Sequence, residues 1–255
     1  MKRPLILVVN DDGINAPGIR KLISIMNDIG DVVVVAPDSP QSGQGHAITI
    51  DSVIHCDKII IDDGPQLEYA CSGTPVDCVK LAFNKFLSRK PDLCVSGINH
   101  GSNSSINVIY SGTMSAAIEG SLEGVPSVGF SLLDYSFDAD FTESELFIRK
   151  ISKSFISDGS LKGICLNVNI PKSIDGKKIK GMKVCRQANA NWIEEFDERI
   201  DPKGNTYYWL TGKFVNYDKG KDTDESALKD HYISIVPVHH DLTDHDSIDK
   251  LNDLL

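Results

Sequence analysis

The stretch LILVVNDDG at residues 5–13 sets the fold class of this chain. Its first part, Leu5–Val9, is an uninterrupted apolar and largely β-branched run, which is typical of a strand buried on both faces of a parallel sheet. Its second part, Asn10-Asp11-Asp12-Gly13, places polar side chains where that strand ends. Because open α/β sheets bind their ligands beyond the carboxyl ends of the strands, the same stretch also predicts the position of a functional site.

The same pattern, a short apolar run followed by a helical period, recurs over the first two thirds of the chain. We predict further strands over 32–36, 47–50, 53–61, 67–71, 93–96, 127–131 and 164–170, and helices over 16–29, 75–87, 113–122 and 141–155. This alternation predicts an α/β fold, with a Rossmann-like, mostly parallel sheet and helices on both of its faces.

The pattern changes near residue 184. Seven aromatic residues lie among many charges up to residue 217, and the turn signal Asp201-Pro202-Lys203-Gly204-Asn205 lies between them. We therefore predict a protruding β-hairpin arm near the C-terminus, with its aromatic residues in a protein–protein contact; packing of these residues on the parent domain is the alternative. The predicted division is a Rossmann-like core at 1–183, the arm at 184–231, and a returning strand with a C-terminal helix at 232–255.

The composition excludes some classes of function. The chain has 255 residues, and 26 Lys and Arg stand against 36 Asp and Glu, a formal net charge of −10. Such a surface repels polyanions and argues against duplex nucleic acid as a partner. No apolar run approaches the length of a membrane span or a signal peptide core, so we expect a cytoplasmic protein without membrane contact. The six cysteines form no C-x-x-C pair, and we expect buried free thiols.

Two polar clusters at predicted strand ends suit a cation. Asp11 and Asp12 offer adjacent carboxylates to a hard cation such as Mg²⁺ or Mn²⁺, although such residues also cap helices and turns. Asn99, in Ser96-Gly97-Ile98-Asn99-His100, offers a neutral oxygen to the same cation. His100 is either a metal ligand, an acid–base group or a solvated loop residue.

Two further clusters suit an anion. In the loop over 38–45, Ser42 and Gly43 offer a hydroxyl and backbone N–H groups to an ion or a phosphate, and a plain flexible loop is the alternative. Tyr110-Ser111-Gly112-Thr113 opens a predicted helix, and the free N–H groups of a helix N-terminus attract anions. A cation beside an anion site is the minimum that hydrolysis of a phosphate ester needs.

Together these clusters resemble the SurE family of stationary-phase survival proteins, which act as nucleoside 5′- and 3′-monophosphate phosphatases. The resemblance spans nearly the whole chain and is strongest over residues 5–132. It is carried by five ordered motifs: Asn10-Asp11-Asp12-Gly13, Val35-Ala36-Pro37-Asp38 with Ser42-Gly43, Gly73-Thr74-Pro75, Ser96-Gly97-Ile98-Asn99 and Tyr110-Ser111-Gly112-Thr113.

The resemblance implies a role for each matching residue. One divalent metal ion per subunit, Mg²⁺ or Mn²⁺, would be bound by Asp11, Asp12, Ser42 and Asn99. Phosphate would be bound by Gly43, Ser111, Gly112 and Thr113. The implied oligomer is a homodimer or homotetramer formed through the arm at 184–231 and through exchanged C-terminal elements.

The implied activity is that of a 5′-nucleotidase, a phosphoric monoester hydrolase with a small nucleotide as its substrate. Asp11 and Asp12 would be catalytic: one of them orients an attacking water, which we favour, or one of them attacks phosphorus directly. The alternative function is a non-catalytic nucleotide-binding or assembly protein on the same fold. A dinucleotide-dependent oxidoreductase is disfavoured, because Asp11-Asp12-Gly13 stands where that class carries G-x-G-x-x-G.

Overall fold

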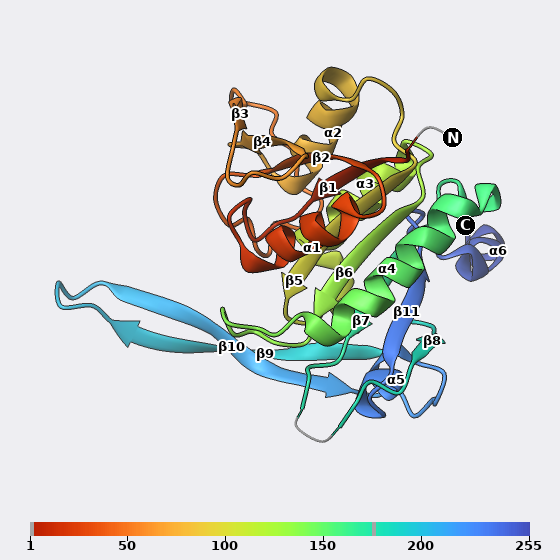
Figure 1. Ribbon diagram of the computed structural model, residues 1–255. Coiled ribbons are helices and arrows are strands. Elements are labelled where there is room, and N and C mark those ends of the chain that lie inside the picture. Colours follow the sequence, from red (N-terminus) through yellow and green to blue (C-terminus); the bar gives the residue numbers. More distant parts are fainter. Residues whose placement is uncertain (1–2, 175–176) are drawn as a thin grey trace.

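The computed structural model describes residues 3–174 and 177–255 (Figure 1). Its strands are β1 (Leu5–Val9), β2 (Asp31–Pro37), β3 (Cys56–Ile59), β4 (Leu67–Cys71), β5 (Leu93–His100), β6 (Ser127–Leu132), β7 (Cys165–Ile170), β8 (Met182–Val184), β9 (Ala190–Ile200), β10 (Thr206–Asn216) and β11 (Ile233–Val238). Its α-helices are α1 (Pro17–Asn27), α2 (Pro75–Leu81), α3 (Gly112–Leu122), α4 (Thr142–Ser157), α5 (Asp224–Lys229) and α6 (His245–Leu254).

The main sheet has the order β3-β4-β2-β1-β5-β6-β7-β11-β8. From β4 to β7 in this order, every strand runs parallel to its neighbours. The antiparallel pairs lie outside this block, between β3 and β4 and between β7 and β11. The predicted α/β fold, with a mostly parallel sheet and helices on its faces, is confirmed.

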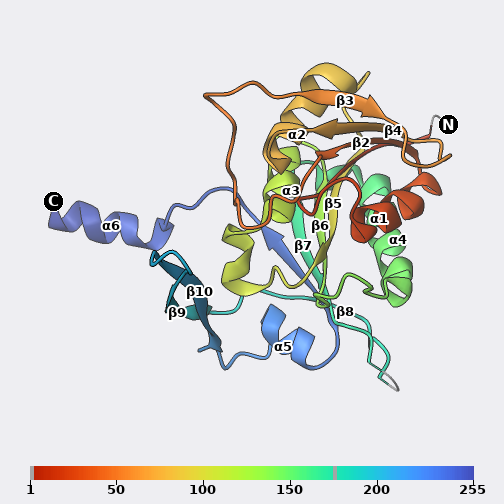
Figure 2. The same ribbon diagram turned by 90° about the vertical axis from the view of Figure 1, so that its left-hand side faces the viewer.

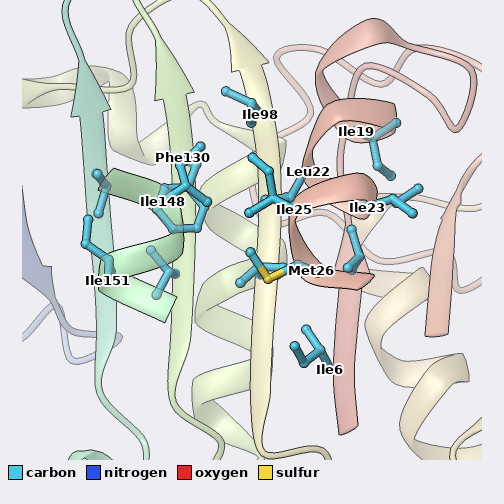
Figure 3. Packing of buried hydrophobic residues seen from close by; sticks show 14 of the residues in the cluster. Ile6, Ile19, Leu22, Ile23, Ile25, Met26, Ile98, Phe130, Ile148 and Ile151 are labelled. Atoms are coloured by element: carbon cyan, nitrogen blue, oxygen red, sulfur yellow. The ribbon is translucent and has the colours of Figure 1, made fainter. Parts of the chain in front are cut away.

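Strand β1 lies near the middle of the sheet and contributes to the cores on both of its faces. Ile6 and Val8 point to the face that α1 and α4 cover, whereas Leu7 and Val9 point to the face that α2 and α3 cover. Figure 3 shows the first of these cores, where Ile6 lies near Met26 of α1, and Ile148 and Ile151 of α4 cover a more distant part of the same face. The uninterrupted apolar run therefore has the physical cause that the sequence predicted, since neither side of β1 faces water.

The order in which the chain adds strands to the sheet reverses at β1. The chain passes from β1 to β2 on one side, and it later returns to place β5 on the other side of β1. At such a switch point the connections after the two strands diverge and leave a crevice. The crevice here lies between the residues that follow β1 and the last residues of β5.

The predicted hairpin arm consists of β9 and β10, which pair only with each other. It projects from the body of the molecule (Figure 1), with the predicted turn between Ile200 and Thr206.

Helix α6 also extends away from the body, as Figure 2 shows. None of its residues is buried. In the part of the chain that the structure describes, no helix combines the length and apolarity that crossing a bilayer requires.

Several predicted elements differ from the structure. Residues 47–50 form no strand, and only Cys56–Ile59 of the predicted strand 53–61 does so. The apolar side chains that suggested these strands lie on the surface, Ile50 being 78% exposed, because loop contacts rather than sheet pairing hold this segment. Helix α5 lies within the stretch predicted as arm, of which the hairpin occupies residues 190–216.

The expectation of free thiols throughout is wrong for two cysteines. Cys56 and Cys71 form a disulfide, because they stand directly opposite each other in the antiparallel pair of β3 and β4. A pairing between strands that are distant in sequence could not be recognised from cysteine spacing alone. Cys78, Cys94, Cys165 and Cys185 are unpaired and buried, as expected.

The burial of β1 gives a testable prediction about stability. Ile6→Ala removes a fully buried side chain, so we expect it to lower the free energy of unfolding by about 2–5 kcal/mol. The matched control is Ile60→Ala, since Ile60 is 86% exposed and its truncation should cost less than about 0.5 kcal/mol. Urea denaturation followed by circular dichroism measures both, and equal losses would show that β1 does not anchor the core.

Candidate active site

Loops that are far apart in the sequence meet at the crevice beside β1. They enclose a cavity of about 210 Å³, which we call the phosphate cavity. Six of the residues predicted from the sequence line it: Asp11, Asp12, Ser42, Gly43, Asn99 and Ser111. The other two, Gly112 and Thr113, lie directly behind Asp11, in the first turn of α3. The structure thus brings all of the predicted site residues into one place.

Asp11 is the most constrained of these residues. Only 3% of it is exposed, and the hydroxyl of Thr113 donates a hydrogen bond to its Oδ1. Helix α3 packs so closely on this carboxylate that a Cβ atom at position 112 would lie 2.7 Å from the Asp11 Cβ, so only glycine fits there. Burial, with a smaller contribution from the neighbouring Asp12 charge, raises the pKa of Asp11 to about 6.

Asp12 is less buried and points to more open space. The backbone N–H of His100 donates to its Oδ2 over 3.3 Å, which ties the end of β1 to the end of β5. Burial raises the pKa of Asp12 as well, whereas the hydrogen bond from His100 opposes that shift. Asp12 lines both the phosphate cavity and an adjoining cavity of about 490 Å³.

The loop that carries Ser42 is fixed at both of its ends. On one side the N–H of Gln41 donates to the carbonyl oxygen of Asp11 over 2.7 Å. On the other side His46 contacts Glu119 of α3 at 3.0 Å, and the side chain of Thr49 donates to Asp77. Ser42 therefore lies on a loop that is anchored to β1 and to the helices behind the sheet.

Asp77 also takes part in a helix start. It completes a capping box with Thr74 at the N-terminus of α2. Burial alone would raise the pKa of Asp77, but the hydrogen bonds from Thr49 and Thr74 hold it below its usual range.

The N-terminus of α3 faces the phosphate cavity. Ser111 is the N-cap residue, and its Oγ accepts the N–H of Met114 over 3.0 Å. N-capping and anion binding can coexist here, because the first N–H groups of a helix have no partners within the helix. Thr113 is fully buried and uses its hydroxyl on Asp11, a contact that the sequence prediction did not include.

The residues present fit a hard divalent cation. The candidate ligands from Asp11, Asp12, Ser42 and Asn99 are all oxygen atoms, which Mg²⁺ and Mn²⁺ prefer. Asn99 donates through Nδ2 to the carbonyl of Gly101 over 2.9 Å, which leaves its side-chain oxygen for a further contact. Within residues 3–174 and 177–255, no three or more His, Cys, Asp or Glu residues form a group suited to a metal ion. A cation at this site would therefore depend on its two carboxylates together with neutral oxygens.

Sequence analysis missed the contribution of the loop between β6 and α4. Tyr135 of this loop lines both cavities, and Phe137 lines the larger one. The signal that could have found them is their position, since two large aromatic residues follow a buried strand directly, where a ligand-binding loop is expected.

The comparisons with known proteins agree with this fold. The family model described as survival protein SurE matches residues 6–194. A 5′-nucleotidase SurE of Christiangramia forsetii is 63% identical over 98% of this chain and 96% of its own length. One of Flavobacterium psychrophilum is 61% identical, covering 99% of this chain and 98% of its own. The crystal structure of the SurE protein from Aquifex aeolicus superposes with a TM-score of 0.82 at 37% identity, over 98% of this chain and 99% of that one.

The fold and site define a Rossmann-like α/β protein with an acidic site at the switch point of its sheet. The chain belongs to the SurE family.

The contact between Thr113 and Asp11 gives a prediction that does not depend on turnover. Thr113→Val keeps the shape of the side chain but removes the donor that orients the Asp11 carboxylate. Loss of such a partner behind a metal ligand typically weakens metal binding about 10–100-fold. Isothermal titration with Mn²⁺ measures the change, and Thr113→Ser, which restores the hydroxyl, should bind Mn²⁺ nearly as well as the original protein. If Thr113→Val bound Mn²⁺ as tightly as the original protein, the Thr113 hydroxyl would not be needed to orient the Asp11 carboxylate for the metal ion.

Proposed function

We propose that this SurE-family protein is a 5′-nucleotidase that hydrolyses nucleoside 5′-monophosphates, and also 3′-monophosphates, with one bound Mg²⁺ or Mn²⁺ per subunit. The observation that carries the proposal is the meeting of the buried Asp11 carboxylate and the half-buried Asp12 carboxylate with the N-terminus of α3 at one cavity. The full-length relatives that bear the name 5′-nucleotidase SurE support the substrate class.

The roles follow from where the side chains lie. Asp11, Asp12, Ser42 and Asn99 would hold the metal ion, which supplies positive charge to a phosphoryl oxygen in an otherwise acidic protein. Ser111, Gly112 and Gly43 would offer N–H and hydroxyl donors to the remaining phosphate oxygens, where charge is spread in the transition state. Thr113 would contribute to phosphate binding through the helix start that it helps to form.

The geometry favours Asp12 over Asp11 as the group that orients an attacking water. Asp11 is nearly fully buried, and its carboxylate lies between Gly112 and Thr113. Asp12 has the more open position, at the border of the two cavities, where a water molecule can approach a phosphate in the smaller one. Direct attack by a carboxylate is the alternative, and it would leave a phosphoaspartyl enzyme that rapid quenching with labelled substrate detects.

The main test is phosphate release from a panel of nucleoside 5′- and 3′-monophosphates with Mg²⁺, with Mn²⁺ and with EDTA. We expect release that requires the metal and that Asp11→Asn nearly abolishes. Asp63→Asn is the matched control, because it removes the same charge from an exposed residue outside the cavity and should leave release unchanged. Binding of nucleotides without any release would instead favour the non-catalytic alternative.

We also propose that the protein is a homodimer or homotetramer, formed through the hairpin and α6. An isolated two-stranded hairpin is marginally stable in water, yet β9 and β10 have no further strand beside them in the described structure. Phe196 and Leu210 face each other across this hairpin, and each is 64% exposed. On α6, Leu251 and Leu254 are 52% and 78% exposed. A second copy of the chain would cover these apolar side chains.

The oligomer is tested by replacing Phe196 and Leu210 together with Glu. Two carboxylates in an apolar contact would be desolvated without partners, so we expect the double variant to dissociate. Size-exclusion chromatography with light scattering measures the mass, and Phe196→Tyr, which keeps an aromatic ring, should remain associated. A monomeric mass for the unaltered protein would overturn the proposal.

A further inference from the structure

The larger cavity beside the phosphate cavity is not used by any role assigned above. It has a volume of about 490 Å³, within the range of small-molecule pockets. It shares Asp12, His100 and Tyr135 with the phosphate cavity, so the two spaces adjoin. A molecule whose phosphate lies in the smaller cavity can therefore extend into the larger one.

Two aromatic rings border this larger cavity without being part of the core. Tyr135 is 77% exposed and Phe137 is 76% exposed. In the part of the chain that the structure describes, neither takes part in an aromatic pair or a cation–π contact. Exposed rings of this size at a cavity rim leave apolar area in water that a ligand could cover.

The loop that presents these rings is held in place. His100 Nδ1 lies 3.0 Å from the carbonyl oxygen of Ser136, the residue between the two aromatic positions. Since a carbonyl oxygen only accepts, the ring nitrogen donates. The N–H of Ser136 donates to Asp134, which also pairs with Lys172 at 3.1 Å. These contacts hold Asp134 and the backbone N–H and carbonyl groups of Ser136, so the loop is fixed at the residue between the two aromatic positions.

Tyr135 is also seated on the neighbouring β5 loop. A Cβ atom at Gly101 would lie 2.3 Å from the Tyr135 Cε1, so the ring rests directly against the backbone at that glycine. Gly101 has a φ of +109°, and only glycine is both small enough and free enough for this position. The ring is thus held where the linings of the two cavities meet.

We propose that Tyr135 and Phe137 form a stacking subsite for the base of the nucleotide, which extends the proposed function and rests on it. A nucleobase offers a flat π face of the kind that stacks on Tyr and Phe, and such stacking accepts any base. The lining of the same cavity includes Asp38, whose charge disfavours a second phosphate group there. The subsite therefore selects a monophosphate that carries a neutral, flat base over sugar phosphates and bisphosphates.

The test compares adenosine 5′-monophosphate with ribose 5-phosphate, which carries a hydroxyl group where the nucleotide carries its base. The ratio of their kcat/KM values measures how much the base contributes. We expect the double variant Tyr135→Ala with Phe137→Ala to lower this ratio roughly tenfold or more, through a higher KM for the nucleotide. Tyr135→Phe keeps a stacking ring and should keep the ratio. Both aromatic residues are exposed, so the substitutions should not disturb folding.

A second readout separates this proposal from the phosphatase activity itself. Calorimetric binding of the same two compounds to the same variants reports base recognition without turnover. A base-dependent affinity that the double variant loses supports the subsite, even if no substrate is hydrolysed and the proposed activity fails. Two results would overturn the subsite: equal kcat/KM values for both substrates in the original protein, or a kcat/KM ratio and a nucleotide affinity that the double variant leaves unchanged. If both compounds were still hydrolysed, the proposed phosphatase activity would stand.

Discussion

The site depends above all on the burial of one carboxylate, that of Asp11, against the first turn of α3. A buried charge must be compensated, and here Thr113 donates to it while Gly112 lets the helix approach. This contact fixes the distance between β1 and α3, and with it the distance between the candidate metal ligands and the helix N-terminus. The Ser42 loop is fixed relative to the same residue, through the hydrogen bond from Gln41 to the Asp11 carbonyl.

Much of this arrangement could be predicted from the sequence, because its causes are local. The uninterrupted apolar run of β1 predicts that this strand is buried on both faces, as it is in the structure. Strand β4 begins and ends at the residues that its sequence pattern predicts. The capping box of Thr74 and Asp77 requires only residues three apart. The residues around the phosphate cavity follow from a general property of parallel sheets, whose strand ends share one edge.

What could not be predicted depends on contacts between distant segments. The disulfide of Cys56 with Cys71 requires the register of β3 against β4, and the hydrogen bond of Thr113 to Asp11 requires the depth at which α3 packs. The same holds for Tyr135, whose place beside Gly101 is decided by tertiary packing. Residues 47–50 show a different kind of error, because the sequence predicted a strand that the structure lacks. The apolar pattern there belongs to a surface loop, which is held by the hydrogen bond of Thr49 to Asp77.

The two-sided burial of β1 also limits how the length of this segment can vary. Alternate residues of β1 belong to different cores, so deleting one residue would exchange the two sets of side chains and point each into the wrong layer. The same deletion would turn the Asp11 side chain away from α3. We therefore expect that the spacing between the start of β1 and the two aspartates that follow it cannot change by a single residue without disrupting both cores and the site.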